Sequence, residues 1–192
     1  MIAAYLDLFV LSVRRPDEAA KRLFALNLSR DALWSGLALA AVLNTLVYIL
    51  SLIVFPPPGP LVGFLSSPLL VLLTLTSVLV ITVFGLFWTG RAMGGTGRFA
   101  DVLTAITWLQ YMRLGVQLAA LVMMFVSPGL ASLAVLAAGL YGVYILAHFL
   151  NAAHRFEALS KAFFLLVLTA MGLVIGLSVF LSVVGAAAMG LS

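Results

Sequence analysis

The stretch TAITWLQYMRLGVQLAALVMMFV, residues Thr104–Val126, decides which fold we expect for this chain. It has the apolar content of a membrane-spanning helix, which needs about 20 residues to cross the hydrocarbon. Arg113 nevertheless lies in its middle, between Gln110 and Gln117. An arginine in mid-membrane costs ~2.5–3.5 kcal/mol on the insertion scale, so we expect its side chain to face the interior of a helical bundle.

The composition of the whole chain is that of a membrane protein. Of its 192 residues, 65% are hydrophobic and 8% are charged, and the mean hydropathy is +1.26. A soluble domain carries roughly 25% charged residues, so this chain has too few to cover a soluble globule. It contains no cysteine, which excludes disulfides and thiolate metal sites. Its basic residues are scattered rather than interleaved with aromatic ones on a basic face, so we expect no nucleic-acid partner.

Four more apolar stretches accompany the first. We therefore predict an all-α integral membrane protein whose five transmembrane helices form one domain over residues 31–192, at approximately 32–55, 65–88, 102–126, 130–150 and 162–185. All five should be helical because isolated strands leave backbone groups unpaired in lipid. We find no internal repeat of the kind that builds inverted-repeat transporters.

Residues 1–30 differ from the rest of the chain. Apolar residues recur at helical spacing up to Val13, but the run is too short to span a membrane and Asp7 interrupts it. We predict one or two short amphipathic helices on the membrane surface; packing against the end of the bundle is a compatible alternative. The basic residues expected to contact lipid head groups are Arg14, Arg15, Lys21, Arg22, Arg91 and Arg98.

The basic residues also predict an orientation. Nine of the ten Lys and Arg residues lie before the first span, between the second and third, or between the fourth and fifth. By the positive-inside rule, these segments and the N-terminus face the cytoplasm, and the C-terminus lies outside.

Two connecting segments carry a family resemblance. GRAMGGTGRFADVLTAITWLQY, residues Gly90–Tyr111, includes a glycine-rich loop at Gly94, Gly95 and Gly97, followed by Phe99. FLNAAHRFEALSKAFF, residues Phe149–Phe164, carries a His–x–Phe–x–x–x–Ser pattern at His154, Phe156 and Ser160. With the five spans and the N-terminal helices, these segments make the chain similar to the Yip domain family.

The resemblance implies a membrane plan rather than a known partner. Eukaryotic members of the family are linked to Rab-type small GTPases and vesicle traffic. This sequence lacks their long polar N-terminal region and its acidic–aromatic–glycine–proline motif, so GTPase binding is not carried over. The alanine-rich and leucine-rich composition without cysteine looks more like a bacterial member, which would lie in the inner (cytoplasmic) membrane.

Arg113 defines the first candidate site. At a rise of ~1.5 Å per residue, several neutral polar side chains fall near its depth and could accept hydrogen bonds from its guanidinium, and no carboxylate does. A pocket of this kind would bind an anion or an anionic lipid; the alternative is an arginine that only locks the bundle together. The candidate residues are Arg113, Gln110, Gln117, Asn44, Tyr141 and Tyr144, with Thr169 near the same level.

A second set of polar residues lies at the predicted cytoplasmic end of the bundle. Its members are Asp101, His148, Asn151, His154 and Arg155. Two histidines six residues apart make a weak metal signal, so we predict a polar interface and no metal, with Asp101 as a partner for His154 or Arg155. We interpret the glycine loop as a tight turn; the alternative is an anion-binding loop.

The remaining features restrict the function. Gly172 and Gly176 have the spacing of close helix packing, either within the chain or in a homo-oligomer. All six acidic residues lie in or beside predicted cytoplasmic segments, which argues against a proton pump. We expect a non-enzymatic adaptor or organiser without a cofactor, which binds membrane lipids and an unknown protein partner; the alternative is an anion or anionic-lipid transporter or channel.

Overall fold

The computed structural model describes residues 2–57, 59 and 67–188, and all the regular structure within them is helical, which confirms the all-α prediction. The helices are α1 (Ile2–Arg14), α2 (Pro16–Ala25), α3 (Arg30–Val54), α4 (Pro68–Ala92), α5 (Phe99–Met124), α6 (Pro128–His154) and α7 (Leu159–Ala188). Residues 65 and 66, where the second span was predicted to begin, lie outside the described residues. Serine side chains cap α3, α4 and α6, because Ser29, Ser67 and Ser127 accept hydrogen bonds from the first turn.

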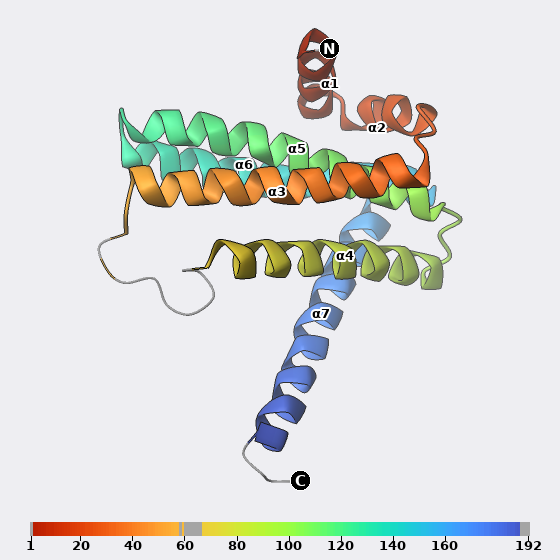
Figure 1. Ribbon diagram of the computed structural model, residues 1–192. Coiled ribbons are helices and arrows are strands. Elements are labelled where there is room, and N and C mark those ends of the chain that lie inside the picture. Colours follow the sequence, from red (N-terminus) through yellow and green to blue (C-terminus); the bar gives the residue numbers. More distant parts are fainter. Residues whose placement is uncertain (1, 58, 60–66, 189–192) are drawn as a thin grey trace.

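Helices α3 to α6 form an up-and-down bundle (Figure 1), in which α5 contacts α3, α4 and α6. Helices of 25–27 residues are roughly 37–40 Å long at 1.5 Å per residue, enough to cross the hydrocarbon. Arg30, Arg91, Arg98 and Arg155 mark where α3 begins, α4 ends, α5 begins and α6 ends. We call this the basic end of the bundle.

Helix α5 occupies the centre of the basic half of the bundle. Every residue from Asp101 to Trp108 is buried. Among the described helices, four are long and apolar enough to cross a membrane by composition: α3, α4, α6 and the part of α7 from Leu159 to Val179. The chain is therefore an integral membrane protein, but hydropathy supports four spans rather than the predicted five. Helix α5 falls short because it carries polar residues in its middle, among them Gln110, Arg113 and Gln117.

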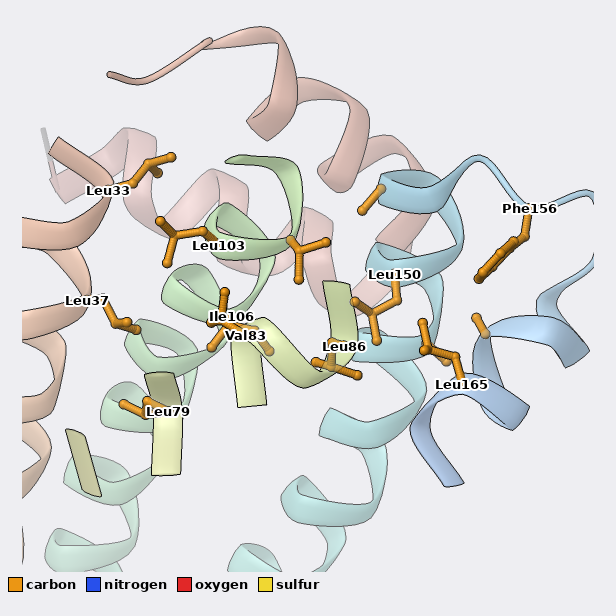
Figure 2. Packing of buried hydrophobic residues seen from close by; sticks show 14 of the residues in the cluster. Leu33, Leu37, Leu79, Val83, Leu86, Leu103, Ile106, Leu150, Phe156 and Leu165 are labelled. Carbon is orange, nitrogen blue, oxygen red and sulfur yellow. The ribbon is translucent and has the colours of Figure 1, made fainter. Parts of the chain in front are cut away.

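The main core joins five helices beneath the basic end. Figure 2 shows its side chains meeting from α3, α4, α5, α6 and the start of α7. Leu37, Val83, Leu103, Leu150 and Leu165 are each at most 2% exposed. The opposite ends of the helices contribute little to this core and present apolar side chains outward, as a lipid-facing surface does.

The N-terminal helices are packed against the bundle. Ala19, Ala20 and Leu23 of α2 are buried in a second cluster with residues of α5 and α6. The structure thus shows the predicted packing alternative, and residues 1–30 share a core with the bundle. Contact of these helices with the membrane surface stays a prediction.

Helix α7 departs from the predicted five-helix arrangement. Ala162, Leu165 and Thr169 are buried against the bundle, but no described side chain after Thr169 is buried. The helix leaves the bundle at a steep angle (Figure 1). A Cβ added at Gly172 or Gly176 would meet nothing within 4 Å, so close packing of this pair within the described chain is wrong. Their use in a homo-oligomer stays a prediction.

Candidate functional site

The glycine-rich loop wraps the end of α6. The backbone N–H of Thr96 donates to the carbonyl oxygen of His154 at 3.1 Å, so the loop continues the hydrogen bonding where α6 stops. A Cβ on Gly95 would lie 2.8 Å from Nδ1 of His154, and a Cβ on Gly97 would overlap the carbonyl group of Ala153. Gly95 and Gly97 are therefore required by close approach of the loop to α6, which goes beyond the predicted tight turn, whereas Gly94 meets the need for a positive φ of 88°.

His154 is the residue that this loop encloses. Its side chain is 0% exposed, and a Cβ on Gly90 of α4 would collide with its ring. The imidazole stacks on Phe156, with 5.3 Å between ring centroids. Leu86 of α4 also presents its backbone to the ring. The stacked rings of His154 and Phe156 thus fill the space between α4, the glycine loop and the end of α6.

Arg98 joins the α2–α3 turn to the start of α5. Its Nη2 donates to Oδ1 of Asp101 at 3.0 Å and to Oδ1 of Asn27 at 3.1 Å. Asn27 has a φ of 43°, a left-handed conformation that asparagine tolerates better than most residues. The hydrogen bond and charge of Asp101 raise the pKa of Arg98 above its usual value. The predicted pairing of Asp101 with His154 or Arg155 is wrong, because the arginine three residues before it on the chain reaches it first.

His148 joins α6 to α2. Its Nδ1 lies 2.7 Å from Oδ1 of Asp17. Asp17 was not predicted as a partner, because an acidic residue in the first turn of a helix is already explained by the helix dipole. Arg155 is exposed and has no ion pair among the described residues. Asn151 buries an Oδ1 without a hydrogen-bond partner in that part of the chain. The predicted polar cluster therefore divides into a His148–Asp17 contact and the enclosed His154.

The predicted head-group residues are all exposed: Arg14, Arg15, Lys21, Arg22, Arg91 and Arg98. Arg15 pairs with Glu18 at 3.0 Å, and the guanidinium carbon of Arg91 lies 5.9 Å from the centroid of the Phe87 ring. Their exposure leaves them available to lipid, and contact with head groups stays a prediction.

Arg113 does not face the bundle interior as predicted. Its side chain is exposed, and it forms no hydrogen bond or ion pair within the described residues. The rise per residue predicts how far along the bundle Arg113 lies. It does not predict toward which side of α5 the Arg113 side chain points. The polar stripe on α5 therefore points in part to the surface, because Arg113 is exposed while the side-chain oxygens of Gln110 and Gln117 are buried.

The other members of the predicted anion site use their polar atoms elsewhere. Asn44 Nδ2 donates to the carbonyl oxygens of Ala40, at 2.8 Å, and Gln110, at 3.3 Å. Tyr141 donates to the carbonyl oxygen of Val13 at 2.7 Å, and Tyr144 stacks on Tyr141. The side-chain oxygens of Gln110, Gln117 and Thr169 are buried without a hydrogen-bond partner in the described chain. Asn44 and Tyr141 thus join neighbouring helices, and no hydrogen bond links any of these side chains to Arg113 in the described chain.

One comparison with known proteins identifies a family, over a range that contains both segments that meet at His154. The family model of the Yip1 domain matches residues 10–181, from the middle of α1 to α7. The chain belongs to the Yip1 domain family. No curated protein and no solved structure matches it. In this Yip1 domain the glycine loop and the His154–Phe156 segment lie far apart in the sequence, and the fold brings them together as one unit at the basic end.

Proposed function

We propose that this Yip1 domain protein is a non-enzymatic adaptor or organiser of a bacterial cytoplasmic membrane, which binds a protein partner at its basic end. One observation carries the proposal: the ion pairs seen in the described residues, Arg15–Glu18, Arg98–Asp101 and His148–Asp17, all lie at or beside this end. Two of them, with Asn27 and Thr96, fix α2 and the connecting loops to the bundle.

A fixed surface of this kind suits recognition. Helix α2 buries Pro16, Ala19, Ala20 and Leu23 and leaves Glu18, Lys21 and Arg22 exposed. Because the inner face anchors the helix, a partner would not have to order it on binding, and preorganisation of this kind favours affinity.

Connectivity supports five spans in the proposed topology. Helix α4 ends at the basic end, and α6 begins at the opposite end (Figure 1). If α4 and α6 cross the membrane, α5 has to return the chain across it, whatever its own hydropathy. By the positive-inside rule, the nine basic residues outside the spans support a cytoplasmic position for the basic end.

The transporter alternative has less support. It requires a charged, water-accessible pathway through the bundle, with Arg113 as its anion-binding group. Arg113 is exposed on the outer surface, and Asn44, Tyr141 and Tyr144 contact other groups. We therefore favour the adaptor function.

Site-specific cross-linking in intact cells tests the proposal. A photoreactive amino acid replaces Lys21 on the exposed face of α2, and a control places it at Val122, an exposed apolar position of α5 near the other end. We expect one discrete protein adduct from position 21, which is lost on competition with unlabelled parent protein, and lipid adducts alone from position 122.

Anion flux into proteoliposomes provides the opposing measurement. We expect the parent protein and Arg113→Gln to give the same flux as empty vesicles. An anion flux that Arg113→Gln abolishes, without any protein adduct at position 21, would replace the adaptor proposal with the transporter.

A further inference from the structure

A second feature of the basic end is a cleft between the start of α3, the end of α4 and the start of α5. It has a volume of about 490 Å³, within the range of ≈ 300–1,000 Å³ that is typical of small-molecule sites. Its lining consists of Arg30, Trp34, Phe84, Phe87, Trp88 and Phe99. None of the contacts described above for the adaptor surface involves Arg30, Trp34 or Phe84.

The walls of this cleft are aromatic. Phe99 stands at the centre, with its ring centroid 5.0 Å from that of Phe84, 5.3 Å from that of Phe87 and 6.1 Å from that of Trp34. Trp88 and Phe84 remain 65% and 43% exposed. A cluster of large rings that stays this open offers an apolar surface to a ligand rather than only to the core.

Arg30 gives the cleft its charge. It is the only charged residue in the lining, it is exposed, and it has no ion pair among the described residues. The cavity of about 170 Å³ beside Arg98 differs, because Asp101 lines it and pairs with that arginine. A ligand that matches one unpaired arginine above an apolar cleft carries an anionic group and an attached hydrocarbon part.

The polarity of the cleft changes with depth as that of a phospholipid does. Arg30 is the first residue of α3, and Trp34 lies four residues further along it, about 6 Å deeper at 1.5 Å per residue. On α4, Trp88 and Phe84 precede the last residue by four and eight positions, which places them about 6 and 12 Å from the helix end. Trp34 and Trp88 thus lie at the same distance from the basic end, as the tryptophans of the aromatic belt at a membrane interface do.

We propose that this cleft binds one anionic phospholipid, with its phosphate against Arg30 and an acyl chain over Phe84 and Trp34. The site goes beyond the adaptor function and does not depend on it. Arg91 strengthens the preference for an anion, because its guanidinium lies against the Phe87 ring. A free phosphate ion would leave the aromatic walls uncovered, so the ligand is the intact lipid.

Native mass spectrometry of the full chain, titrated with phosphatidylglycerol or phosphatidylcholine in mild detergent, tests the site. We expect the parent protein to retain one phosphatidylglycerol in preference to phosphatidylcholine. Arg30→Gln should weaken phosphatidylglycerol binding about fivefold or more, as loss of one lipid-facing cation implies. Arg30→Lys should restore most of it. Arg14→Gln is the matched control, because Arg14 is exposed and lies outside the cleft; it should bind as the parent does.

Further measurements separate the site from a general charge effect and from a folding defect. Trp88→Ala keeps Arg30 and removes an exposed wall, so it should also weaken binding of the lipid. Thermal unfolding without added lipid should be unchanged in Arg30→Gln. Glycerol 3-phosphate at millimolar concentration should not compete. Equal loss in Arg14→Gln, full retention in both Arg30→Gln and Trp88→Ala, or competition by glycerol 3-phosphate would each overturn the proposal.

Discussion

At the scale of single residues, Gly97 makes the contact least able to accommodate a side chain. Its missing Cβ would fall on the backbone carbonyl of Ala153, and neither backbone can move without displacing the loop from α6. We predict that Gly97→Ala lowers the free energy of unfolding by ~1–3 kcal/mol, as overpacking typically does. Thermal unfolding of the purified protein in detergent measures the change.

Gly139→Ala is the control for that substitution. Gly139 lies on α6, the helix that Gly97 contacts, but an added Cβ there meets nothing within 4 Å. Alanine in a helix interior is favoured over glycine by roughly 0.5–1 kcal/mol, so this variant should unfold at the same temperature as the parent or higher. If the two variants behave alike, the enclosure of α6 by the loop does not stabilise the protein.

Arg113 and the glycine loop show what residue patterns could and could not predict. The glycines were recognisable as a turn, because their density is a local property of the sequence. Their role as an enclosure for His154 depends on a residue nearly sixty positions away, which spacing cannot reveal. The depth of Arg113 followed from its position in the span, but its direction depends on which neighbours surround α5, and the prediction about its direction was wrong.

At the scale of elements, three hydrogen bonds join α1 to the bundle, through Tyr5, Ser12 and Val13, and the one at Ser12 is buried. Trp108 Nε1 of α5 donates to Oγ of Ser12 at 2.9 Å, and Ser12 is 0% exposed. Ser12→Ala leaves the indole N–H without its acceptor, which we expect to cost ~1–3 kcal/mol. Hydrogen–deuterium exchange should become faster in α1 and remain unchanged in α3 and α6.

Ser132→Ala is the matched control. Ser132 is exposed, and its hydroxyl donates only to the carbonyl oxygen of Pro128 in its own helix. This variant should exchange as the parent does throughout α1. Unchanged exchange of α1 in Ser12→Ala would show that its other contacts, including the hydrogen bonds of Tyr5 and Tyr141, suffice to hold it.

The same helices show why element prediction was uneven. The four apolar spans and both N-terminal helices were predictable from run length and breakers such as Pro16, which are local signals. The place of α1 against α5 was not, since it depends on partners such as Trp108 and Tyr141 that are distant in the sequence. Helix α5 was predicted as a span from its run length, but Gln110, Arg113 and Gln117 keep its hydropathy below that of the four helices that meet the criterion.

At the scale of the whole molecule, α7 determines on which side the chain ends. Its residues after Lys161 carry no charge, and its apolar residues surround the helix. A helix that is apolar all round has no polar face with which to lie along an interface, so it belongs inside the hydrocarbon. Because it starts at the basic end, a helix of this length has to emerge on the other side.

We therefore predict that the basic end lies in the cytoplasm and the C-terminus lies outside. A fluorescent protein that folds only in the cytoplasm and a phosphatase that is active only outside it are each fused at two positions. After Glu157, in the connection between α6 and α7, the fluorescent fusion should be active and the phosphatase inactive. At Ser192 the activities should be reversed. Fluorescence at both positions would mean that α7 does not cross, and the protein would then have its two ends on the same side of the membrane.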